Sequence, residues 1–505
     1  MGIFSTLVGA RVPHRYRRFF KLPERKPSFK AERTDGTTLA RLAAAWRANN
    51  GCECGVYRLD LGSEALDIRL GLIDMAEVSI DIQSYLVKDD LSGNLIALAL
   101  IEAASRGVRV RLLMDDALTQ PVDPGLLALS HHVNIDVRVF NPFPRHRSRF
   151  VSFIANFNLL NRRMHNKSFT VDNAITIVGG RNLADEYYQT SAESEFLDDD
   201  LMAIGDVVHD VADGFDEYWN TLEATPIEEL GEPQAMPSIT EIVQAGKSYI
   251  EEHAGSPVLE QLGDELTTRL KNGTLEFFAA RAELVLDHPD KVRGLVRRKV
   301  GETSEYLRRK ASAAESELIV VSPYFVPLAQ GVDLFSALVR KGVRVVVITN
   351  SLASTNHPSV HAVYARYRKP LLRQGIELYE LRPGFERADP AQPSPEKFTL
   401  HSKLAIVDRK LAFVGSFNLD PRSLYINTEM GMAVESAALA SGMAESIDAS
   451  LGRNTYRLVL ARTGGIRWLY DGYDGERPAK REPHTTLWRR ISTRLMSLLP
   501  IESQM

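Results

Sequence analysis

Cysteine is almost absent from this 505-residue chain, which contains only Cys52 and Cys54. A single intervening residue is poor geometry for a disulfide, and no further cysteine or histidine stands nearby to complete a zinc site. The sequence therefore excludes a disulfide-stabilised secreted scaffold, and it predicts a reducing or cysteine-indifferent environment.

Long apolar runs are also missing. No stretch approaches the roughly 20 residues that a helix needs to cross a bilayer. The apolar start, "MGIFSTLVGA", is followed rather than preceded by basic residues, which is the reverse of a secretory signal. We therefore expect neither a membrane-spanning helix nor a secreted protein.

The chain also lacks a strong imbalance of charge. Its formal net charge of −4 is near neutral for its size, so the overall field does not indicate a nucleic-acid-binding protein. Hydrophobic residues make up 44% of the chain and charged residues 25%, which is typical of a folded protein. The length predicts two or three domains.

What the chain does contain is a repeated polar motif. Residues 164–182 read "MHNKSFTVDNAITIVGGRN", and residues 400–418 read "LHSKLAIVDRKLAFVGSFN". The copies share the same polar positions at identical spacing, which are His165, Lys167, Asp172 and Asn182 in the first and His401, Lys403, Asp408 and Asn418 in the second. Two matched copies make chance similarity an inadequate explanation.

The repeat extends well upstream of the motif. Residues 76–116 run parallel to residues 314–350, and each stretch offers a strand, a tyrosine, a helix closed by glycine, and a second apolar strand. This order predicts a βαβ unit with parallel pairing in each half. We therefore expect an α/β protein of two halves, divided as 1–50 (basic N-terminal segment), 51–225 (first half), 226–300 (linker and helices), 301–460 (second half) and 461–505 (C-terminal tail).

The motif chemistry suits a phosphodiester. On a strand, residues two apart share a face, so each histidine lies beside its lysine. If the halves pack about a pseudo-twofold axis, two imidazoles and two ammonium groups form one site. One imidazole can attack phosphorus while the other serves as acid and then base, and the lysines can carry the oxygen charge. We expect no metal and no cofactor, because lysine is a poor metal ligand.

The spacing H-x-K-x(4)-D-x(6)-G-[GS]-x-N, present twice, resembles the motif of the phospholipase D superfamily. The resemblance covers about residues 60–440 and implies two α/β/α sandwich halves, a shared active site and a covalent phosphohistidine intermediate. By the family pattern His165 is the nucleophile and His401 the acid and base, although the sequence alone does not fix this order. Gly180 replaces the usual serine in the first copy, whereas Ser416 keeps it in the second.

Further site residues follow from the same resemblance. It implies an acidic residue behind each histidine, and Asp198 and Glu429 stand 33 and 28 residues after their histidines. It also implies substrate-binding groups, for which the candidates are Asn182, Ser416 and Asn418. Asp172 and Asp408 complete the catalytic motif, but strand alternation points them away from the histidines. We interpret these two aspartates as structural turn residues.

The superfamily includes lipid hydrolases, phosphatidyltransferases and nucleases, so fold alone does not settle the substrate. The stretches "RVFNPF", "LLNRRMHNKSFTVD" and "VGGRN" resemble the bacterial cardiolipin synthases, and the C-type most of all. This implies transfer of a phosphatidyl group, from phosphatidylglycerol or phosphatidylethanolamine, onto the hydroxyl of phosphatidylglycerol. The alternatives are a phospholipase D hydrolase releasing phosphatidic acid and, less favoured, a nuclease or other phosphodiesterase.

Both chain ends predict contact with an anionic membrane surface. Residues 1–33 hold nine basic residues against two acidic ones. The C-terminal "LWRRISTRLMSLLPIESQM" places large apolar residues near one helical face and three arginines off it, as in an interfacial helix. The alternative is a helix docked on its own domain. We expect a peripheral membrane protein at the cytoplasmic face of a bacterial inner membrane.

Overall fold

The computed structural model describes residues 27–502, apart from 118, 120–121, 145–159, 192, 231–235, 257–258, 260–261, 263–265, 294–299, 385–394, 471–477 and 500–501. Most of the basic residues predicted at the N-terminus therefore lie outside the described part of the chain.

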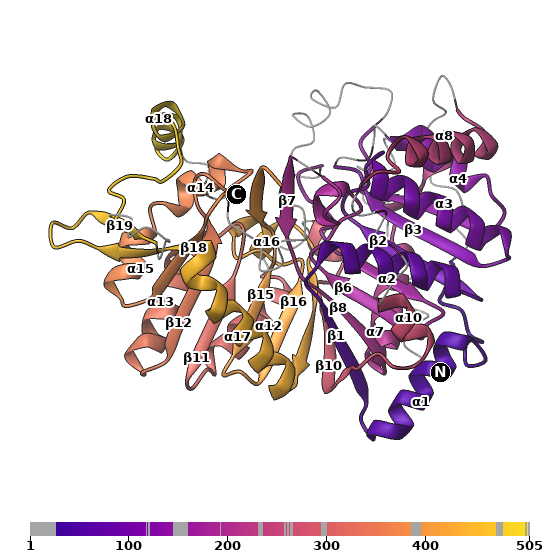
Figure 1. The fold of residues 1–505 in the computed structure, drawn as a ribbon, viewed down its shortest axis with the longest axis horizontal. Helices are drawn as coiled ribbons and strands as arrows, with labels where there is room; N and C mark the ends of the chain where they lie inside the picture. Colours follow the sequence, from indigo (N-terminus) through magenta and orange to yellow (C-terminus); the bar gives the residue numbers. More distant parts are fainter. Residues whose placement is uncertain are drawn as a thin grey trace.

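Eight strands in the described chain build the sheet of the first half, in the spatial order β1, β8, β6, β5, β2, β3, β4 and β9. Figure 1 shows the two halves side by side, with β1, β2, β3, β6 and β8 of this sheet labelled. Strand β2 pairs parallel with β3, and β3 with β4, while the other neighbours are antiparallel. The strands are β1 (Cys54–Leu59), β2 (Ser79–Ser84), β3 (Arg109–Asp115), β4 (Ile135–Phe140), β5 (Ser168–Val171), β6 (Ile175–Gly179), β8 (Asp200–Gly205) and β9 (Ala224–Pro226).

The second half repeats this order strand for strand. Its sheet runs β10, β17, β16, β15, β11, β12, β13 and β18, with β19 added at the far edge. The strands are β10 (Phe278–Leu286), β11 (Glu317–Val321), β12 (Arg344–Asn350), β13 (Glu377–Leu381), β15 (Leu404–Val407), β16 (Leu411–Gly415), β17 (Met430–Glu435), β18 (Thr455–Leu460) and β19 (Ile466–Leu469). The predicted duplicated α/β architecture is confirmed.

Helices cover both faces of each sheet. One face of the first sheet packs against α1 (Thr38–Asn50), α2 (Gly62–Met75), α3 (Leu91–Ser105) and α4 (Asp123–Ser130), and the other against α7 (Val207–Trp219). In the second half the corresponding layers are α12 (Glu302–Ser312) and α13 (Leu328–Arg340) on one face and α17 (Ala437–Asn454) on the other. Shorter helices are α11 (Asp290–Arg293), α14 (Pro358–Tyr364), α15 (Arg368–Arg373) and α16 (Pro421–Tyr425).

The helix ends follow from local sequence. Asp90 caps α3 by accepting a hydrogen bond from the Gly93 N–H at 3.0 Å. Gly107 and Gly342, predicted to close the repeated helices, both have positive φ, at 98° and 88°. Glycine adopts this conformation without steric cost, so each helix turns sharply into the next buried strand.

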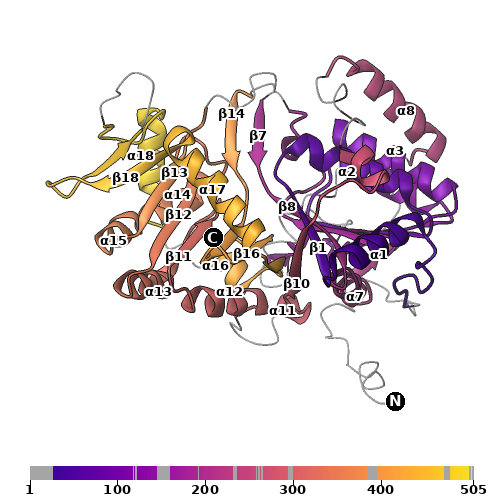
Figure 2. The same cartoon turned by 60° about the horizontal axis from the view of Figure 1, so that its bottom comes forward.

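The two sheets join edge to edge, because β1 pairs antiparallel with β10. A second junction is the small parallel sheet of β7 (Ser194–Leu197) and β14 (Lys397–Leu400), one strand from each half, which Figure 2 shows side by side between the halves. A hydrophobic core runs across this junction and contains residues of both sheets together with α7 and α17.

The region between the halves differs from its prediction as a linker with helices. It contains α8 (Ile239–Glu252) and α10 (Leu266–Lys271), which pack on α3 and α2, but also β10 of the second sheet. The second half therefore begins at β10, before the predicted start near residue 301. Residues 281–286 of β10 pair with β17, as β1 pairs with β8, so this strand belongs to the repeat.

Candidate active site

The first motif stands at the edge where its strand begins. His165 and Lys167 precede β5 rather than lying on it as expected, and Met164 forms an isolated parallel bridge with Thr428 of the other half. The His165 N–H donates to the Thr428 carbonyl at 2.9 Å. The Lys167 ammonium donates to the carbonyl of His165 at 2.7 Å, and both side chains are buried.

The second motif is anchored in the matching way. His401 and Lys403 precede β15, and the His401 N–H donates to the Leu197 carbonyl of the first half at 2.8 Å. The Lys403 ammonium donates to the carbonyl of its own histidine. Each motif is thus hydrogen-bonded to the residue just before a carboxylate of the opposite half, since Thr428 precedes Glu429 and Leu197 precedes Asp198.

This anchoring exchanges the carboxylates between the halves. Sequence order places Asp198 behind His165 and Glu429 behind His401. In the structure His165 Nδ1 lies 2.9 Å from Glu429 Oε2, and His401 Nδ1 lies 2.6 Å from Asp198 Oδ2. Both predicted carboxylates contact a motif histidine, but each contacts the histidine of the other motif rather than the one that it follows in the sequence. Each carboxylate follows a strand segment that crosses to the other motif.

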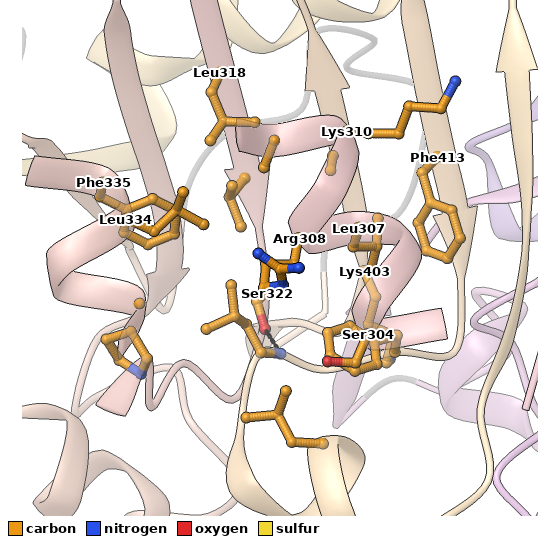
Figure 3. Close-up of a pocket in the computed structure, with 18 of the residues that line it drawn as sticks. Ser304, Leu307, Arg308, Lys310, Leu318, Ser322, Leu334, Phe335, Lys403 and Phe413 are labelled. Atoms are coloured by element: carbon orange, nitrogen blue, oxygen red, sulfur yellow. Dashed lines mark hydrogen bonds between the residues drawn. The ribbon is translucent and has the colours of Figure 1, made fainter. Parts of the chain in front are cut away.

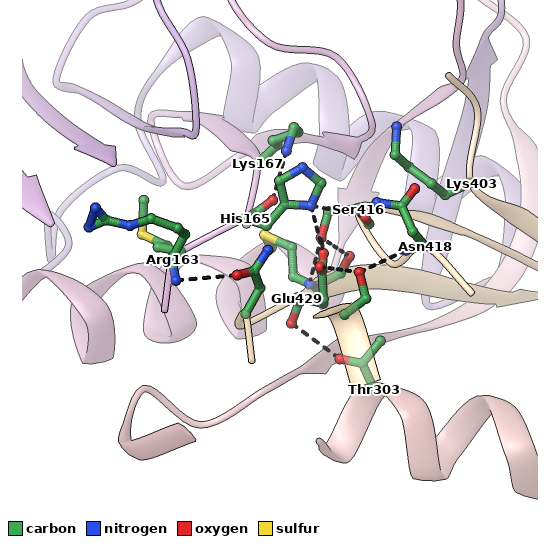
Figure 4. A network of polar contacts seen from close by, with 12 residues as sticks. Arg163, His165, Lys167, Thr303, Lys403, Ser416, Asn418 and Glu429 are labelled. Carbon is green, nitrogen blue, oxygen red and sulfur yellow. Dashed lines mark hydrogen bonds and ion pairs between the residues drawn. The ribbon is translucent and has the colours of Figure 1, made fainter. Parts of the chain in front are cut away.

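The two imidazoles have unequal neighbours at Nδ1. His165 Nδ1 faces only acceptors among the described residues: Glu429 and, at 3.1 Å, the Ser416 carbonyl (Figure 4). Nδ1 must therefore carry the proton, which leaves Nε2 with a lone pair. His401 Nδ1 instead faces an acceptor, Asp198, and a donor, Lys403 Nζ, which lies 2.6 Å away. Either tautomer of His401 therefore has a partner.

Aromatic rings complete the walls around the histidines. Tyr85 contacts His165 edge to face at 5.0 Å between ring centroids, and its repeat partner Tyr324 approaches His401 at 6.4 Å. Phe196 stacks on His401 at 5.2 Å, while Tyr187 meets it edge-on at 5.1 Å. The tyrosine found in each copy of the repeat is the sequence signal for this first pair of contacts. Phe196 and Tyr187 were missed, because the second half offers no aromatic residue at the matching positions, Asn427 and Ser423.

The motif aspartates hold the fold, as predicted. Asp172 accepts hydrogen bonds from the backbone N–H groups of Glu77, Val78 and Ser79, at 2.8–3.0 Å. Asp408 does the same for Glu315, Ser316 and Glu317, at 2.7–3.1 Å. Both residues have positive φ, at 50° and 52°. They tie the turn after the motif strand to the start of the neighbouring strand.

The predicted substrate-binding residues separate into two kinds. Asn182 and Asn418 are buried, and each has a side-chain oxygen without a hydrogen-bond partner among the described residues, so substrate binding stays a prediction for both. The Ser416 hydroxyl instead donates to Glu429 at 2.5 Å. Its hydroxyl is occupied in holding the carboxylate, so the prediction of direct substrate binding by Ser416 is not supported.

Steric crowding explains why the first half has Gly180 at the position equivalent to Ser416. A Cβ atom at Gly180 would lie 2.1 Å from Oδ1 of Asp198. A serine there would push this carboxylate away from His401. The first half therefore supports its carboxylate through the Asp199 N–H, at 2.9 Å, rather than through a hydroxyl.

The two lysines share one strongly positive, desolvated environment, with Lys167 and Lys403 on either side of His165 in Figure 4. Burial and then the charge of Lys403 lower the pKa of Lys167 to about 7. Burial lowers the pKa of Lys403 to about 8, against the opposing attraction of Asp198 and Glu429. Two buried ammonium groups that repel each other favour the binding of an anion between them.

The same buried surroundings shift the pKa values of the histidines and of the carboxylates. Burial lowers the pKa of His165, and burial together with Lys403, Lys167 and His165 lowers that of His401 well below its usual value. Burial raises the pKa of Asp198 to about 6. Burial also acts to raise the pKa of Glu429, but His165, Ser416 and Ser423 outweigh it and hold that pKa below its usual value. Glu429 is therefore a stable anion, whereas Asp198 titrates near neutrality.

Within the described residues, no cluster of three or more histidine, cysteine, aspartate or glutamate side chains is arranged to hold a metal ion. A reaction without metal or cofactor stays a prediction.

Two α/β halves that place paired His-x-Lys motifs at one junction define the phospholipase D class of fold. The crystal structure of phosphatidylserine synthase from Haemophilus influenzae Rd KW20 superposes with a TM-score of 0.55 at 14% identity, covering 84% of this chain and 92% of that one. The family described as cardiolipin synthase, PLD-like domain, matches residues 70–219 and 307–451, one segment in each half. The chain belongs to this family.

Individual relatives agree with this assignment. Cardiolipin synthase C of Escherichia coli (strain K12) is 40% identical over 462 residues, which are 89% of this chain and 96% of that protein. A cardiolipin synthase of Oceanobacillus iheyensis is 26% identical over 430 residues, 84% of this chain and 74% of its own. The predicted superfamily and the prediction of an enzyme are confirmed.

Proposed function

We propose that this enzyme is a phosphatidyltransferase that makes cardiolipin through a covalent phosphatidyl-histidine intermediate. The observation that carries the mechanism is the inequality of the two Nδ1 environments. One histidine is locked in a single tautomer by acceptors, and the other stands between a carboxylate and an ammonium group. A two-step displacement gives its two imidazoles different roles, one as nucleophile and the other as acid and base.

In the first step Nε2 of His165 attacks the phosphorus of the donor lipid. Its Nδ1–H points to Glu429, so the imidazolium formed during attack is stabilised by an anion in a water-poor site. The Nε2–phosphorus bond forms as the bond from phosphorus to the head-group oxygen breaks. The leaving alkoxide takes a proton from Nε2 of the His401 imidazolium, which becomes the neutral Nδ1–H form.

In the second step His401 reverses its role. A hydroxyl group of phosphatidylglycerol gives its proton to Nε2 of His401 while its oxygen attacks phosphorus, and the bond to His165 breaks. Asp198 accepts from the Nδ1–H of His401 in both steps, so the ring alternates between the imidazolium and the neutral form that keeps its proton on Nδ1.

Lys167 and Lys403 bind the non-bridging phosphate oxygens in this mechanism. Their ammonium groups now rest on the carbonyls of their own histidines, which places them beside the reacting imidazoles. An anionic phosphodiester between them offsets their mutual repulsion and restores their protonated state. Asn182 and Asn418 are further candidates for contacts to these oxygens.

The substrate assignment rests on the relatives named as cardiolipin synthases. The acceptor is phosphatidylglycerol, and the donor is phosphatidylglycerol or phosphatidylethanolamine. The decisive test incubates purified protein with isotopically labelled forms of both lipids, with and without EDTA, and separates the products. Cardiolipin formation that survives EDTA supports the proposal, whereas phosphatidic acid as the sole product would make the protein a hydrolase.

Membrane attachment is part of this proposal, and α18 (Leu487–Met496) supports it. Its polar side rests on the protein, where Arg489 donates to the Thr355 carbonyl at 3.1 Å and Thr493 is buried. Its apolar side faces outward, with Trp488 76% exposed and Leu498, just beyond the helix, 78% exposed. Figure 1 shows the helix standing out from the body of the second half. The helix is thus docked on its own domain, as the alternative expected, but through its polar side, which leaves the apolar side exposed.

An exposed face of this kind matches the boundary between lipid head groups and acyl chains. Among the described helices none is long and apolar enough to cross a bilayer. Attachment at the cytoplasmic face of a bacterial inner membrane stays a prediction.

Deleting residues 485–505 tests the attachment. We expect binding to anionic vesicles to weaken at least about tenfold, because three arginines near such a surface each contribute about 1 kcal/mol. The measurement is vesicle co-sedimentation, with a thermal melt as the control for folding. Unchanged binding accompanied by a large fall in melting temperature would show that the tail serves the fold instead.

A further inference from the structure

The internal repeat allows one wall of the two halves to be compared position by position. Asp172 and Asp408 bind matching N–H groups, and the motifs match residue by residue, so equivalent positions are fixed. Under the helices α2 and α3 of the first half, and α12 and α13 of the second, four equivalent pairs differ in size or charge, which are Arg69 and Leu307, Phe169 and Ala405, Arg181 and Phe417, and Asp200 and Gly431.

In the first half these positions fill the space between sheet and helices. Arg69 lies 2.8 Å and Arg181 3.3 Å from Oδ2 of Asp200, and all three side chains are buried. Phe169 occupies the neighbouring place on β5 and is also buried. Every residue of β5 is buried as a result. The remaining space amounts to about 10 Å³, too little for any ligand larger than water.

In the second half the same space is open. The ion cluster is gone, Ala405 replaces the phenylalanine, and residues of β15 alternate between buried and half-exposed. The result is a cavity of about 430 Å³ under α12 and α13 (Figure 3). Its walls are mainly apolar, with Leu307, Leu334 and Phe413 among them.

One polar group of the active site belongs to this wall. Lys403 lines the cavity together with Ala405 and Val407, which follow it on the same face of the chain. The Lys403 side chain extends from this wall to the carbonyl of His401, so it links the cavity to the active site. In the first half Lys167 has no such cavity beside it, because Phe169 and the Arg69–Asp200–Arg181 cluster stand there.

We propose that this cavity binds one acyl chain of the phospholipid whose phosphate is held at Lys403. A cation at one end and hydrocarbon walls beyond it are complementary to an anionic amphiphile, not to a polar nucleotide or a sugar phosphate. The volume falls within the range of pockets that enclose a small ligand. The inference rests on the proposed phosphatidyl transfer. It assigns binding of the acyl chain to the second half.

Filling the cavity tests the assignment. Ala405→Phe restores the side chain that the first half carries at this position, and Ala311→Phe fills the cavity from α12. Turnover is measured with long-chain and with short-chain phosphatidylglycerol, each as donor. For both variants we expect the ratio of long-chain to short-chain kcat/KM to fall at least tenfold relative to the wild type.

The matched control is Ala313→Phe, which adds the same bulk at the exposed C-terminal cap of the same helix. It should leave the ratio unchanged, and a thermal melt of all three variants checks folding. A ratio that does not change in either cavity variant overturns the acyl-chain site. If wild-type protein makes no cardiolipin from either lipid, the proposed function fails instead, so the two failures are distinguishable.

A labelling experiment gives an answer independent of turnover. Phosphatidylglycerol with a photoactivatable diazirine near the end of one acyl chain is irradiated with the full-length protein in mixed micelles. Adducts are located by peptide mass spectrometry. We expect them on Leu307, Leu334 or Phe335, and their loss in Ala405→Phe. Adducts confined to α18 would overturn the proposal. So would a change of molecular mass in Ala405→Phe, because it would indicate that a second copy of the chain fills the cavity.

Discussion

The two halves have the same strand order and the same motif, but they differ in the groups around the motif histidine and in the space beside the motif lysine. His165 of the first half faces only acceptors at Nδ1, while His401 of the second half faces an acceptor and a donor. The first half packs an ion cluster behind its lysine, and the second half leaves a cavity there. A symmetric scaffold thus supports an asymmetric reaction, because a few side chains around it differ.

The most severe way to test this comparison is to remove each histidine in turn. We expect His165→Asn to abolish turnover, by about ten-thousandfold or more, and to prevent any covalent adduct. His401→Asn should also stop turnover but still permit slow labelling of His165, because the nucleophile and Glu429 remain while nothing is left to deprotonate the acceptor. Intact-mass measurement after brief incubation with phosphatidylglycerol distinguishes them. Labelling of His401 in the His165→Asn variant would reverse the assignment.

Neutralising each of the exchanged carboxylates tests the different roles of the two histidines. Glu429→Gln should slow formation of the adduct at least about a hundredfold, because the imidazolium of His165 loses its anion. Asp198→Asn should instead let the adduct accumulate, because His401 can no longer deprotonate the acceptor efficiently. Rapid-quench sampling of the adduct measures both effects.

The same carboxylate-to-amide substitutions at exposed positions serve as controls for Glu429→Gln and Asp198→Asn. Glu435→Gln and Asp60→Asn remove one negative charge from each half at exposed positions. They should leave adduct formation and breakdown unchanged. If Glu429→Gln and Asp198→Asn had the opposite effects to those expected, the pairing across the halves would not describe the working enzyme.

Exchanging the glycine and serine beside the carboxylates tests a smaller difference. Gly180→Ser should lower kcat at least about tenfold by displacing Asp198, although the sequence then matches the family motif more closely. Ser416→Gly removes a charge-assisted hydrogen bond to Glu429 and should cost a comparable factor of about ten. Steady-state kinetics with a thermal melt separates an effect on the site from one on the fold. A Gly180→Ser enzyme of full activity would contradict the steric explanation.

We expect the smallest difference between the halves in the pH dependence of kcat/KM, where the two lysines lose their protons at different pH. As pH rises through about 7, Lys167 loses its proton first, and Lys403 follows near 8. As pH falls through about 6, Asp198 gains a proton and His401 loses its anionic partner. The profile of kcat/KM for the free enzyme should therefore be a narrow bell with its maximum near neutrality.

Arginine substitutions separate the two lysines in this profile. Because arginine stays charged, Lys167→Arg should move the alkaline limb upward by about one pH unit, while Lys403→Arg should move it less, since the earlier titration of Lys167 remains. The comparison uses a short-chain phosphatidylglycerol over the full pH range. Equal shifts for both variants would show that the two lysines do not differ as their surroundings imply.

Much of the fold, and the residues that we propose for the site, could be predicted from the sequence, because the repeat supplies spacing that one motif alone lacks. Matching the two copies predicted the duplicated α/β architecture, the joint use of both histidines and the structural role of Asp172 and Asp408. The resemblance to the phospholipase D superfamily supplied Asp198 and Glu429. The cardiolipin synthase relatives and the family match confirm the predicted class of reaction.

What the sequence did not show depends on contacts between the halves. The exchange of Asp198 and Glu429 results from the pairing of β7 with β14 and of Met164 with Thr428, which no spacing along the chain specifies. Strand β10 was missed because Arg281 and Glu283 interrupt its apolar pattern. The cavity could not be read from a pattern, since it arises where Ala405 and Gly431 leave space that Phe169 and Asp200 fill.

The exchanged carboxylates also determine when the enzyme becomes reactive during its own synthesis. The chain emerges from the ribosome with its first half leading, and domains fold largely in that order. His165 is then complete in its own half, but its partner Glu429 lies 264 residues further along. The nucleophile cannot be charged until nearly the whole polypeptide has been made. A truncated product of interrupted translation therefore carries the motif without the means to attack a membrane lipid.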